Sequence, residues 1–461
     1  MPQPTAVVHA PPSLRQIAAL ALPQMGLMLC HLGISMTDLW VAGRLDPRVL
    51  ASLGIVGQIF MLLMLLTSVA GSGCLAAISQ ALGANLPLRA RRYAGLILMM
   101  ATFAGSVVGF LGYLSLPLLI ATMSVPDDLL PVVRTFTGVY CLNLPCFYTF
   151  VMMNSMCRAY KLVHLPFFSS LFVFVANFIG SLGFGLGYWG LPYCSYAGIA
   201  WSTFGSNALG VVISLLAVTR HGIIGTSSFA TWRWNLRALP YLLRVSIPSV
   251  AGQLVEHGGR MTMLGIVATL PGAVDILAGM TLGMRIHSVL MFPLGAVSLT
   301  MAIFSGHLLG SGQSDTLFRF GRKASATSAA VFAILAFALY CLREHTSGLM
   351  APRPEVVSHA VLYLSFACIG IPALACAMTL HGVFSGAGAT PLALLAGVVS
   401  MWGIQVPVGW YLSRQPAWGE MGVFMAVLLA ELVYAGCIVL LYGSKKWLRF
   451  GMKNHKFPSR K

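Results

Sequence analysis

The sequence predicts an all-α polytopic membrane protein with twelve transmembrane helices in two six-helix lobes. Of its 461 residues, 58% are hydrophobic and only 8% are charged, and the mean hydropathy is +0.84. Soluble domains carry about 25% charged residues, so this chain has too little charge to cover a water-exposed surface. The apolar runs lack the alternation of a barrel, and unpaired backbone groups are costly in hydrocarbon, so each run is expected to be helical.

Twelve apolar runs reach the length of about 20 residues that a helix needs to span a bilayer. They cover approximately residues 15–42, 50–80, 93–120, 134–158, 165–188, 197–219, 240–270, 275–310, 324–343, 357–385, 392–412 and 421–443. The first run continues beyond signal-peptide length without a clear cleavage site, which favours a membrane helix. We therefore expect an N-terminal lobe over 1–219 (helices 1–6), a cytoplasmic linker over 220–239, a C-terminal lobe over 240–443 (helices 7–12) and a basic cytoplasmic tail over 444–461.

The placement of the 28 Lys and Arg residues predicts the orientation of the chain. Most of them lie in the N-terminus, the C-terminal tail and the even-numbered connections. The odd-numbered connections hold Arg44, Arg48, Arg134, Arg343, Arg353 and Arg414. This bias follows the positive-inside rule and places both termini in the cytoplasm. The net charge of +17 therefore indicates topology rather than nucleic-acid binding, and we expect a multi-pass, monomeric protein of the cell inner membrane in contact with the lipid bilayer.

The two halves of the chain resemble each other in the order of their Pro and Gly positions. The matched pairs are Leu22-Pro23 with Ile247-Pro248, Leu82-Gly83 with Leu309-Gly310, Leu144-Pro145 with Ile371-Pro372, Pro166 with Pro391, and Gly198 with Gly422. With six helices in each half, both copies have the same orientation, so they would be related by a pseudo-two-fold axis along the membrane normal. Parallel repeats that rock around a midplane site are a recurrent transporter design. The duplication therefore favours transport.

Three of the eleven acidic residues lie within predicted helices, namely Asp38, Glu256 and Glu431. A carboxylate in hydrocarbon persists only if it is paired, protonated or functional. Asp38 could exchange a proton between the two sides or ligate Na⁺. It could equally be an acid at a helix end that reaches outside water or pairs with Arg44. Glu431 has no partner nearby in the sequence and is interpreted as a structural acid paired with another helix.

Glu256 lies in a polar stretch of the seventh helix, with Gln253 one turn before it and Arg260 one turn after it. The i,i+4 spacing places Glu256 and Arg260 on one face, where they could simply neutralise each other. Alternatively, Glu256 exchanges Arg260 for a proton, Na⁺ or a cationic substrate, helped by local unwinding at Gly258-Gly259. Arg285 lies within the eighth helix and must face a cavity or a partner, for which Glu256 is a candidate.

No motif in the sequence indicates an energy source or catalytic site within the chain. The G-x-x-x-x-G-K-[ST] pattern of a nucleotide-binding loop is absent, and no catalytic constellation is evident. The ten Cys are scattered without metal-ligand spacing. We therefore expect neither an enzyme nor a cofactor nor a bound structural metal, and transport energy would come from an H⁺ or Na⁺ gradient.

These residues resemble the multidrug and toxic compound extrusion (MATE) family over nearly the whole chain. The resemblance is carried by Leu20-Ala21-Leu22-Pro23, Ala42-Gly43-Arg44-Leu45, Gln80-Ala81-Leu82-Gly83-Ala84, Gly198-Ile199-Ala200-Trp201-Ser202-Thr203, Met291-Phe292-Pro293-Leu294 and Gly306-His307-Leu308-Leu309-Gly310. It implies two six-helix lobes in a V that export an organic compound (a drug, toxin or natural-product metabolite) in exchange for H⁺ or Na⁺ by alternating access.

The resemblance also implies site residues. Asp38 matches the first-helix carboxylate of the family, and Glu256 matches the acid of its seventh helix, so both are predicted to couple ion movement, with Na⁺ possible at either. The predicted substrate and cation pocket comprises Tyr140, Asn177, Ser181, Thr203, Gln253, Arg260 and Arg285. Ser181 and Gly370 stand where many or some members of the family carry acids.

Two other functions are compatible with parts of the sequence. A lipid-linked oligosaccharide flippase of the same superfamily would have a cationic cavity, to which Arg260 and Arg285 would contribute. A membrane-embedded enzyme acting on lipids would need a nucleophile with a base, or a metal cluster, near one interface, and neither is evident. Secondary active efflux is therefore the main prediction.

Overall fold

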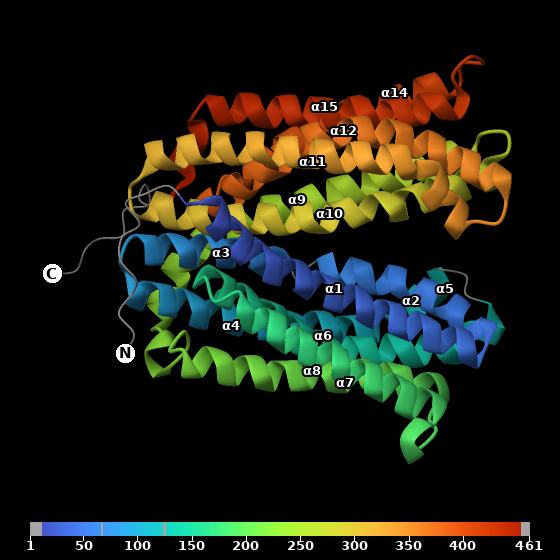
Figure 1. Cartoon of the computed structure of the whole chain (residues 1–461). Helices are drawn as coiled ribbons and strands as arrows, with labels where there is room; N and C mark the ends of the chain where they lie inside the picture. The colour runs from blue at the N-terminus through green and yellow to red at the C-terminus, as the bar shows by residue number, and fades with distance from the viewer. Residues whose placement is uncertain (1–11, 66–67, 123–125, 453–461) are drawn as a thin grey trace. The chain divides into compact units, whose positions relative to one another are not determined.

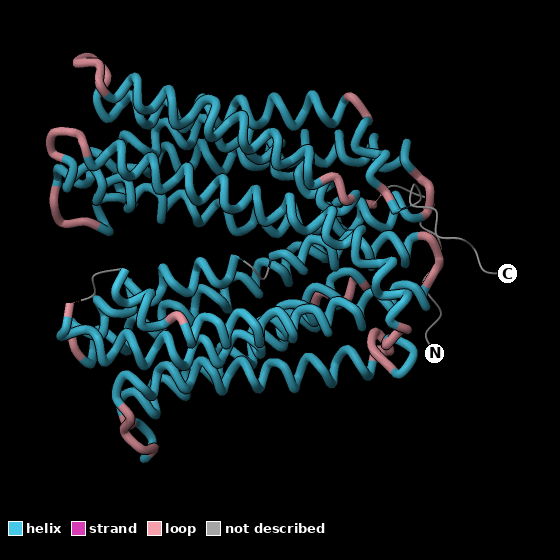
Figure 2. Tube along the Cα trace, turned by 180° about the vertical axis from the view of Figure 1, so that it is seen from behind, coloured by secondary structure: helices cyan, strands magenta, loops and turns pink. Residues whose placement is uncertain are grey.

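The computed structural model describes residues 12–65, 68–122 and 126–452. Within these ranges the chain consists of helices joined by turns, without a strand (Figure 2). Each of the twelve predicted membrane segments coincides with a helix or with consecutive helices, which confirms the predicted all-α class.

In its described residues, the first half of the chain forms eight α-helices and three short 3₁₀ turns (Figure 1). The α-helices are α1 (Leu14–Leu45), α2 (Pro47–Leu65), α3 (Ser68–Gly83), α4 (Pro87–Leu114), α5 (Leu116–Thr122), α6 (Leu130–Ala159), α7 (His164–Leu186) and α8 (Ser195–Arg220). The 3₁₀ turns are η1 (Asp127–Leu129), η2 (Tyr188–Gly190) and η3 (Thr226–Ser228). The predicted segment 50–80 coincides with α2 and α3, and residues 66–67 between them lie outside the described chain.

Up to residue 452, where the described chain ends, the second half forms seven α-helices, a π-helical segment and a 3₁₀ turn. The α-helices are α9 (Trp232–Ala268), α10 (Ala273–Gly310), α11 (Ser314–Met350), α12 (Pro354–Ala387), α13 (Thr390–Val398), α14 (Val406–Ser413) and α15 (Gly419–Gly443). The π-helix η4 (Val399–Gln405) joins α13 to α14, and the turn η5 (Lys446–Phe450) follows α15. In this half, α12 packs against α10, α11 and α15, as Figure 1 shows.

Local sequence explains where several helices begin and end. At the start of α1, the Ser13 hydroxyl accepts from the Gln16 N–H (3.3 Å) while the Gln16 side chain accepts from the Ser13 N–H (3.0 Å). This reciprocal pair is a capping box. Helices α7 and α12 end at Gly187 and Gly388, both with φ of +76°, a left-handed conformation that glycine adopts without strain.

Ten segments of the described chain are long and apolar enough to cross a membrane. They comprise α1, α4, α6, α7, α8, α10, α11, α12, the continuous stretch from α13 to α14, and α15. The other two predicted segments, 50–80 and 240–270, correspond to the shorter helices α2 and α3 and to the more polar α9. The chain is thus a multi-pass membrane protein.

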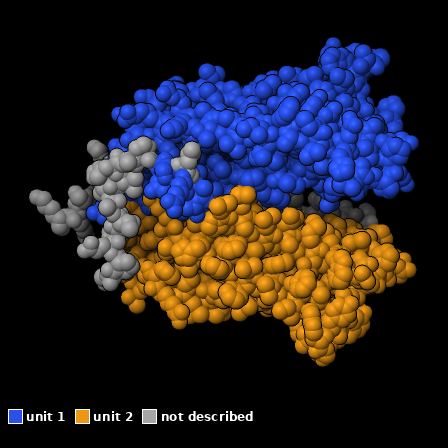
Figure 3. Space-filling model, viewed as in Figure 1, with its two compact units in different colours: residues 1–21, 83–85, 247–461 blue, residues 22–82, 86–246 orange. Residues whose placement is uncertain are grey.

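The chain divides into two compact units (Figure 3). One comprises residues 22–82 and 86–246, and the other comprises residues 1–21, 83–85 and 247–461. The boundary between the units falls within α9, because the first turns of this helix pack on the unit that comprises residues 22–82 and 86–246. The Trp234 ring lies 5.2 Å from that of Tyr93, and the guanidinium of Arg92 lies over Trp234. The predicted lobes, linker and tail remain predictions.

The first residues of the predicted tail are helical and packed, while residues 453–461 lie outside the described chain. In η5, Trp447 is fully buried and stacks on Tyr442 with ring centroids 5.2 Å apart. Its indole N–H donates to the Tyr442 carbonyl oxygen at 3.0 Å. Burial of an aromatic side chain of this size stabilises the end of α15 against fraying.

Candidate functional site

Asp38 lies in a buried polar site formed by α1, α7 and α8, within the unit that comprises residues 22–82 and 86–246. One carboxylate oxygen accepts from the Ser181 hydroxyl at 3.0 Å, and the other accepts from the Thr203 hydroxyl at 3.3 Å. The Asn177 side-chain N–H donates to the Thr203 hydroxyl oxygen at 3.2 Å. All four side chains are buried, and Asp38 is 6% exposed. The structure therefore brings four of the predicted residues together from three helices.

Small residues allow these three helices to approach one another closely. A Cβ on Gly180 of α7 would lie 2.8 Å from the Ser202 hydroxyl of α8. A Cβ on Gly185 of α7 would lie 2.9 Å from a methyl group of Val41 of α1. Both distances are shorter than van der Waals contact, so a larger residue at either position would separate the helices. Small residues at helix interfaces are the usual means of close packing in membranes.

The partners of Asp38 are neutral. In the described part of the chain the carboxylate has no ion-pair partner. The Arg44 side chain is exposed and lies over the Trp40 ring, 5.0 Å from its centroid. The structure therefore does not support the alternative of an Asp38–Arg44 pair. A buried charge without a counter-charge is costly, so a proton or a bound cation would be needed to neutralise it.

Aromatic rings and an unpaired amide oxygen complete the Asp38 site. The Tyr140 hydroxyl interacts with Thr203, and the Tyr140 ring packs between Phe60 and Phe136 with centroid distances of 4.8 and 5.8 Å. The Asn177 Oδ1 atom is buried without a hydrogen-bond donor among the described residues. The site thus presents carboxylate, hydroxyl and amide oxygens, which are the ligand types that hard cations prefer.

A second candidate site is a cavity of about 330 Å³ within the other unit. Its polar or titratable lining comprises Ser249, Gln253, Glu256, His381, Thr390, Ser400, Gln405, Glu431 and Tyr434. The predicted residues Gln253 and Glu256 therefore line one cavity. The volume lies at the lower end of the range for small-molecule sites, and the rest of the wall is apolar.

Glu256 forms the predicted ion pair with Arg260, at 2.6 Å between Oε1 and a guanidinium nitrogen. The two side chains are 60% and 43% exposed, respectively. Exposed i,i+4 pairs contribute only about 0.3–0.5 kcal/mol to stability. The pair can therefore open at little cost, which is compatible with exchange of Arg260 for another cation.

Arg285 is exposed and is not among the residues that line the cavity. The structure thus does not bring Arg285 to Glu256, and its predicted place in the pocket stays a prediction. The reason is its position on α10, whose buried stripe at this level includes Ile286 and His287.

The π-helix η4 contributes to the cavity wall next to Glu256. The Trp402 indole N–H donates to the Val255 carbonyl oxygen at 3.1 Å, and Met401 packs so closely on α9 that a Cβ on Gly259 would collide with it. The Gly258-Gly259 pair therefore serves close helix approach here, and α9 remains helical through it. A π-bulge in an α-helical segment is frequently found at a functional site.

Glu431 is predicted from the sequence to be a structural acid paired with another helix. It lines the same cavity as Glu256, and its Oε2 atom is buried without a hydrogen-bond partner among the described residues. The interpretation as a paired structural acid is therefore wrong. The partner-free state could not be predicted, because it depends on which side chains of other helices reach position 431.

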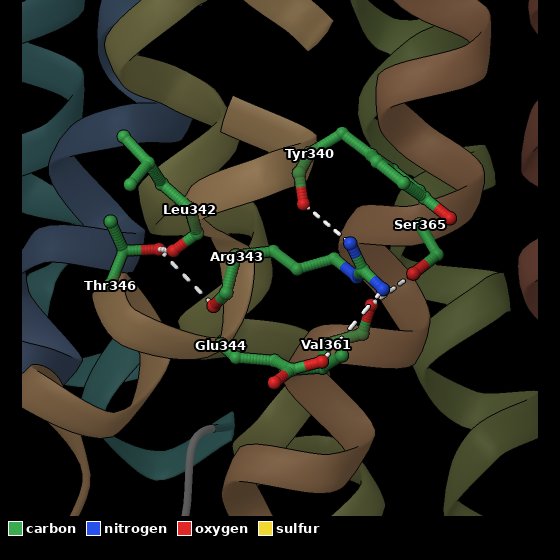
Figure 4. A network of polar contacts seen from close by, with 7 residues as sticks. All are labelled: Tyr340, Leu342, Arg343, Glu344, Thr346, Val361 and Ser365. Carbon is green, nitrogen blue, oxygen red and sulfur yellow. Dashed lines mark hydrogen bonds and ion pairs between the residues drawn. The ribbon is translucent and has the colours of Figure 1, made fainter. Parts of the chain in front are cut away.

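Arg343 near the end of α11 contacts neighbouring residues of the same helix. Arg343, at the far end of α11, donates to the Tyr340 carbonyl oxygen at 2.5 Å, lies 4.0 Å from the Tyr340 ring centroid and approaches Glu344 at 3.8 Å. Figure 4 shows its side chain extending from α11 toward Val361 and Ser365. Such Arg–aromatic contacts are typical of membrane interfaces. Among the described residues, no three His, Cys, Asp or Glu side chains are grouped as metal ligands.

Known proteins share this fold and this sequence pattern. The MatE family model matches residues 23–182 and 248–411. The transporter YisQ of Bacillus subtilis, described as uncharacterized, is 21% identical over 90% of this chain and 91% of its own length. The multidrug resistance protein PmpM of Pseudomonas aeruginosa is 22% identical over 95% of this chain and 93% of its own. The probable multidrug resistance protein NorM of Thermotoga maritima is 20% identical, covering 94% and 93%.

Solved structures agree with this assignment at the level of the fold. The MATE transporter VcmN of Vibrio cholerae in its bent form matches with a TM-score of 0.86 and 20% identity, covering 94% of this chain and 97% of that one. A transporter of the MOP superfamily from Pyrococcus furiosus matches with a TM-score of 0.84 and 17% identity, covering 95% and 96%. The family match and the curated relatives define a multi-pass membrane transporter, not an enzyme. The chain belongs to the MatE family, and the match does not favour the flippase alternative.

Proposed function

We propose that this chain is a monomeric cation-coupled antiporter of the inner membrane, with both termini in the cytoplasm, that exports an organic compound by alternating access. Relatives described as multidrug resistance proteins support export of a drug, toxin or natural-product metabolite. The observation that carries the coupling is the environment of Asp38, a buried carboxylate whose side-chain hydrogen-bond donors among the described residues are all neutral.

The coupling follows from the charge of this site. With Asp38 ionised, the site holds one uncompensated negative charge, and a proton or Na⁺ removes it. Loading therefore changes the electrostatic free energy of whichever conformation encloses the site. A ligand shifts a conformational equilibrium only through such a difference in its affinity for the two states. An inward ion gradient would then bias the alternation that carries the organic compound outward.

Glu256 is the second carboxylate in this proposal. Its partner Arg260 and its exposure allow the ion pair to open for a proton, Na⁺ or a cationic group of the substrate. Gln253, one turn away on the wall of the same cavity, offers an amide for hydrogen bonding to a bound compound. Tyr140 and its ring neighbours provide an aromatic surface beside Asp38.

The test is efflux of ethidium from proteoliposomes with an imposed pH or Na⁺ gradient. One gradient is expected to accelerate efflux, and Asp38→Asn and Glu256→Gln are each expected to abolish that acceleration. Asp46→Asn is the matched control, because Asp46 is exposed and contacts only the backbone of Arg48. If both variants keep gradient-driven efflux, or if neither gradient drives efflux, the proposal is overturned.

A further inference from the structure

Glu431 lies midway along α15 as a carboxylate without a counter-charge. It has no ion pair and its Oε2 has no hydrogen bond within the described chain, yet this atom is inaccessible to solvent. An isolated carboxylate at a membrane-spanning position costs several kcal/mol or is neutralised. We propose that Glu431 is the cation-binding carboxylate of the cavity that Glu256 and Glu431 both line, taking a proton or Na⁺, and that Gly370 makes room for it. This proposal rests on the antiport function proposed above.

Gly370 shows that the fold accommodates this carboxylate specifically. Gly370 lies midway along α12, which packs against α15. A Cβ at this position would overlap the Glu431 Oε2 atom and would also lie 3.4 Å from a Leu428 methyl group. Every residue except glycine would therefore displace the carboxylate from its place. The absence of a side chain at 370 is what lets an acid on α15 occupy space beside α12.

The two acids that line the cavity differ in charge balance. Glu256 has Arg260 at 2.6 Å, so this pair is neutral. Glu431 has no such cation, so it alone gives the cavity a net negative charge when ionised. A monovalent cation that enters removes an uncompensated charge at Glu431, whereas at Glu256 it must first displace Arg260.

The other side chains around Glu431 include both titratable groups and uncharged groups that could bind a cation. On α12, the titratable groups near Glu431 are Tyr363, Cys368 and His381, and on α9 they are Glu256 and Arg260. His381 shares a hydrogen bond of 2.9 Å with the Tyr434 hydroxyl on α15, which occupies both groups. Helix α13 and η4 present only uncharged side chains to the cavity, including Thr390, Ser400 and Gln405. The oxygens of such groups can complete the coordination of Na⁺.

The first test labels carboxyl groups in the purified full-length chain, without any transport measurement. Dicyclohexylcarbodiimide adds to protonated carboxyl groups in apolar surroundings, and peptide mass spectrometry locates the resulting N-acylurea. Glu431 is expected to be labelled several-fold more than Glu256, because its Oε2 atom is buried without a partner while Glu256 is exposed and paired with Arg260. Glu344, whose side chain is 77% exposed, is the exposed control and is expected to remain unlabelled.

Two arms of this experiment distinguish the cations. Protection of Glu431 by NaCl but not by choline chloride supports a Na⁺ site, whereas labelling that falls with rising pH and is indifferent to NaCl supports a proton site. Failure to label Glu431 at any pH overturns the proposal. Because the readout is independent of efflux, it can fail while antiport through Asp38 stands, and it can succeed if no gradient drives ethidium.

The second test moves the carboxylate from α15 to α12. Glu431→Ala is expected to abolish the Na⁺ or pH dependence of ethidium efflux. Combined with Gly370→Asp, which places a carboxylate in the space that Glu431 leaves, it is expected to regain that dependence. Gly370→Asn with Glu431→Ala is the control of equal volume without the charge. Equal behaviour of the two double variants would show that charge at this place has no role and would overturn the proposal.

Discussion

Asp38→Asn is the substitution for which the structure predicts opposite changes in stability and in transport. Asn keeps the volume of Asp, and its Oδ1 can still accept from one of the two hydroxyls now at 3.0 and 3.3 Å. The other hydroxyl can rotate to accept from the new amide. Loss of charge weakens each hydrogen bond by about 1 kcal/mol. Burying the Asp38 charge without a counter-ion destabilises the folded state by several kcal/mol, and Asn removes this desolvation cost.

The expected net effect is a free energy of unfolding that is unchanged or higher by up to about 3 kcal/mol. In a chain of this length, each kcal/mol shifts the unfolding midpoint by about 1 °C, so the midpoint of Asp38→Asn should rise by about 0–3 °C. Transport should change in the other direction. Without a titratable carboxylate the ion has no differential affinity for the two states, so the ratio of ethidium efflux with and without the gradient should fall to about one.

The assay combines thermal unfolding, followed by the fluorescence of the nine Trp residues, with ethidium efflux from proteoliposomes at matched protein density. A midpoint several degrees below that of the unmodified chain would refute the argument, because it would show that the carboxylate stabilises the fold. If the gradient still accelerates ethidium efflux by Asp38→Asn, the assignment of ion coupling to Asp38 is refuted, because another residue must then couple the ion to transport.

Two further substitutions separate packing from charge. Gly180→Val would bring a side chain against the Ser202 hydroxyl, so we expect a loss of about 1–3 kcal/mol and loss of ion-dependent efflux as α7 and α8 separate. Gly205→Ala on α8, which meets nothing within 4 Å, is the control, and equal destabilisation by the two substitutions would contradict this account. Glu256→Gln should lower the unfolding free energy by no more than about 0.5 kcal/mol, because the pair with Arg260 is exposed, while efflux is lost. A large fall in its unfolding midpoint would instead mark the pair as structural.

The sequence was sufficient to predict the membrane helices, because lipid requires long apolar runs with internal hydrogen bonds. Helix ends were less accurate. The segment predicted over 324–343 is the interior of α11 (Ser314–Met350), since polar residues at helix ends do not contribute to an apolar window. The change from α13 to the π-helix η4 was not predicted, because the extra residue in a π-turn leaves no mark in composition.

For the polar sites, the types of residue within the helices predicted which acids matter, but the sequence did not predict which side chains of other helices contact them. An acid in an apolar run is rare enough to single out Asp38, Glu256 and Glu431 from the sequence alone. The i,i+4 spacing of Glu256 and Arg260 also predicts their contact, because a helix fixes that geometry locally. That Glu431 has no ion-pair partner among the described residues could not be predicted in the same way, because it depends on contacts between helices.

What the sequence determined by itself is therefore the membrane-embedded helical class and the short set of acids within helices, since each depends on local composition and spacing. What only the tertiary structure decided is which acids have a counter-charge. Asp38 receives hydroxyls from α7 and α8, and Glu431 occupies the space left by Gly370 on α12. Both depend on contacts between helices far apart in the chain, and a carboxylate becomes structural or ion-binding according to those contacts.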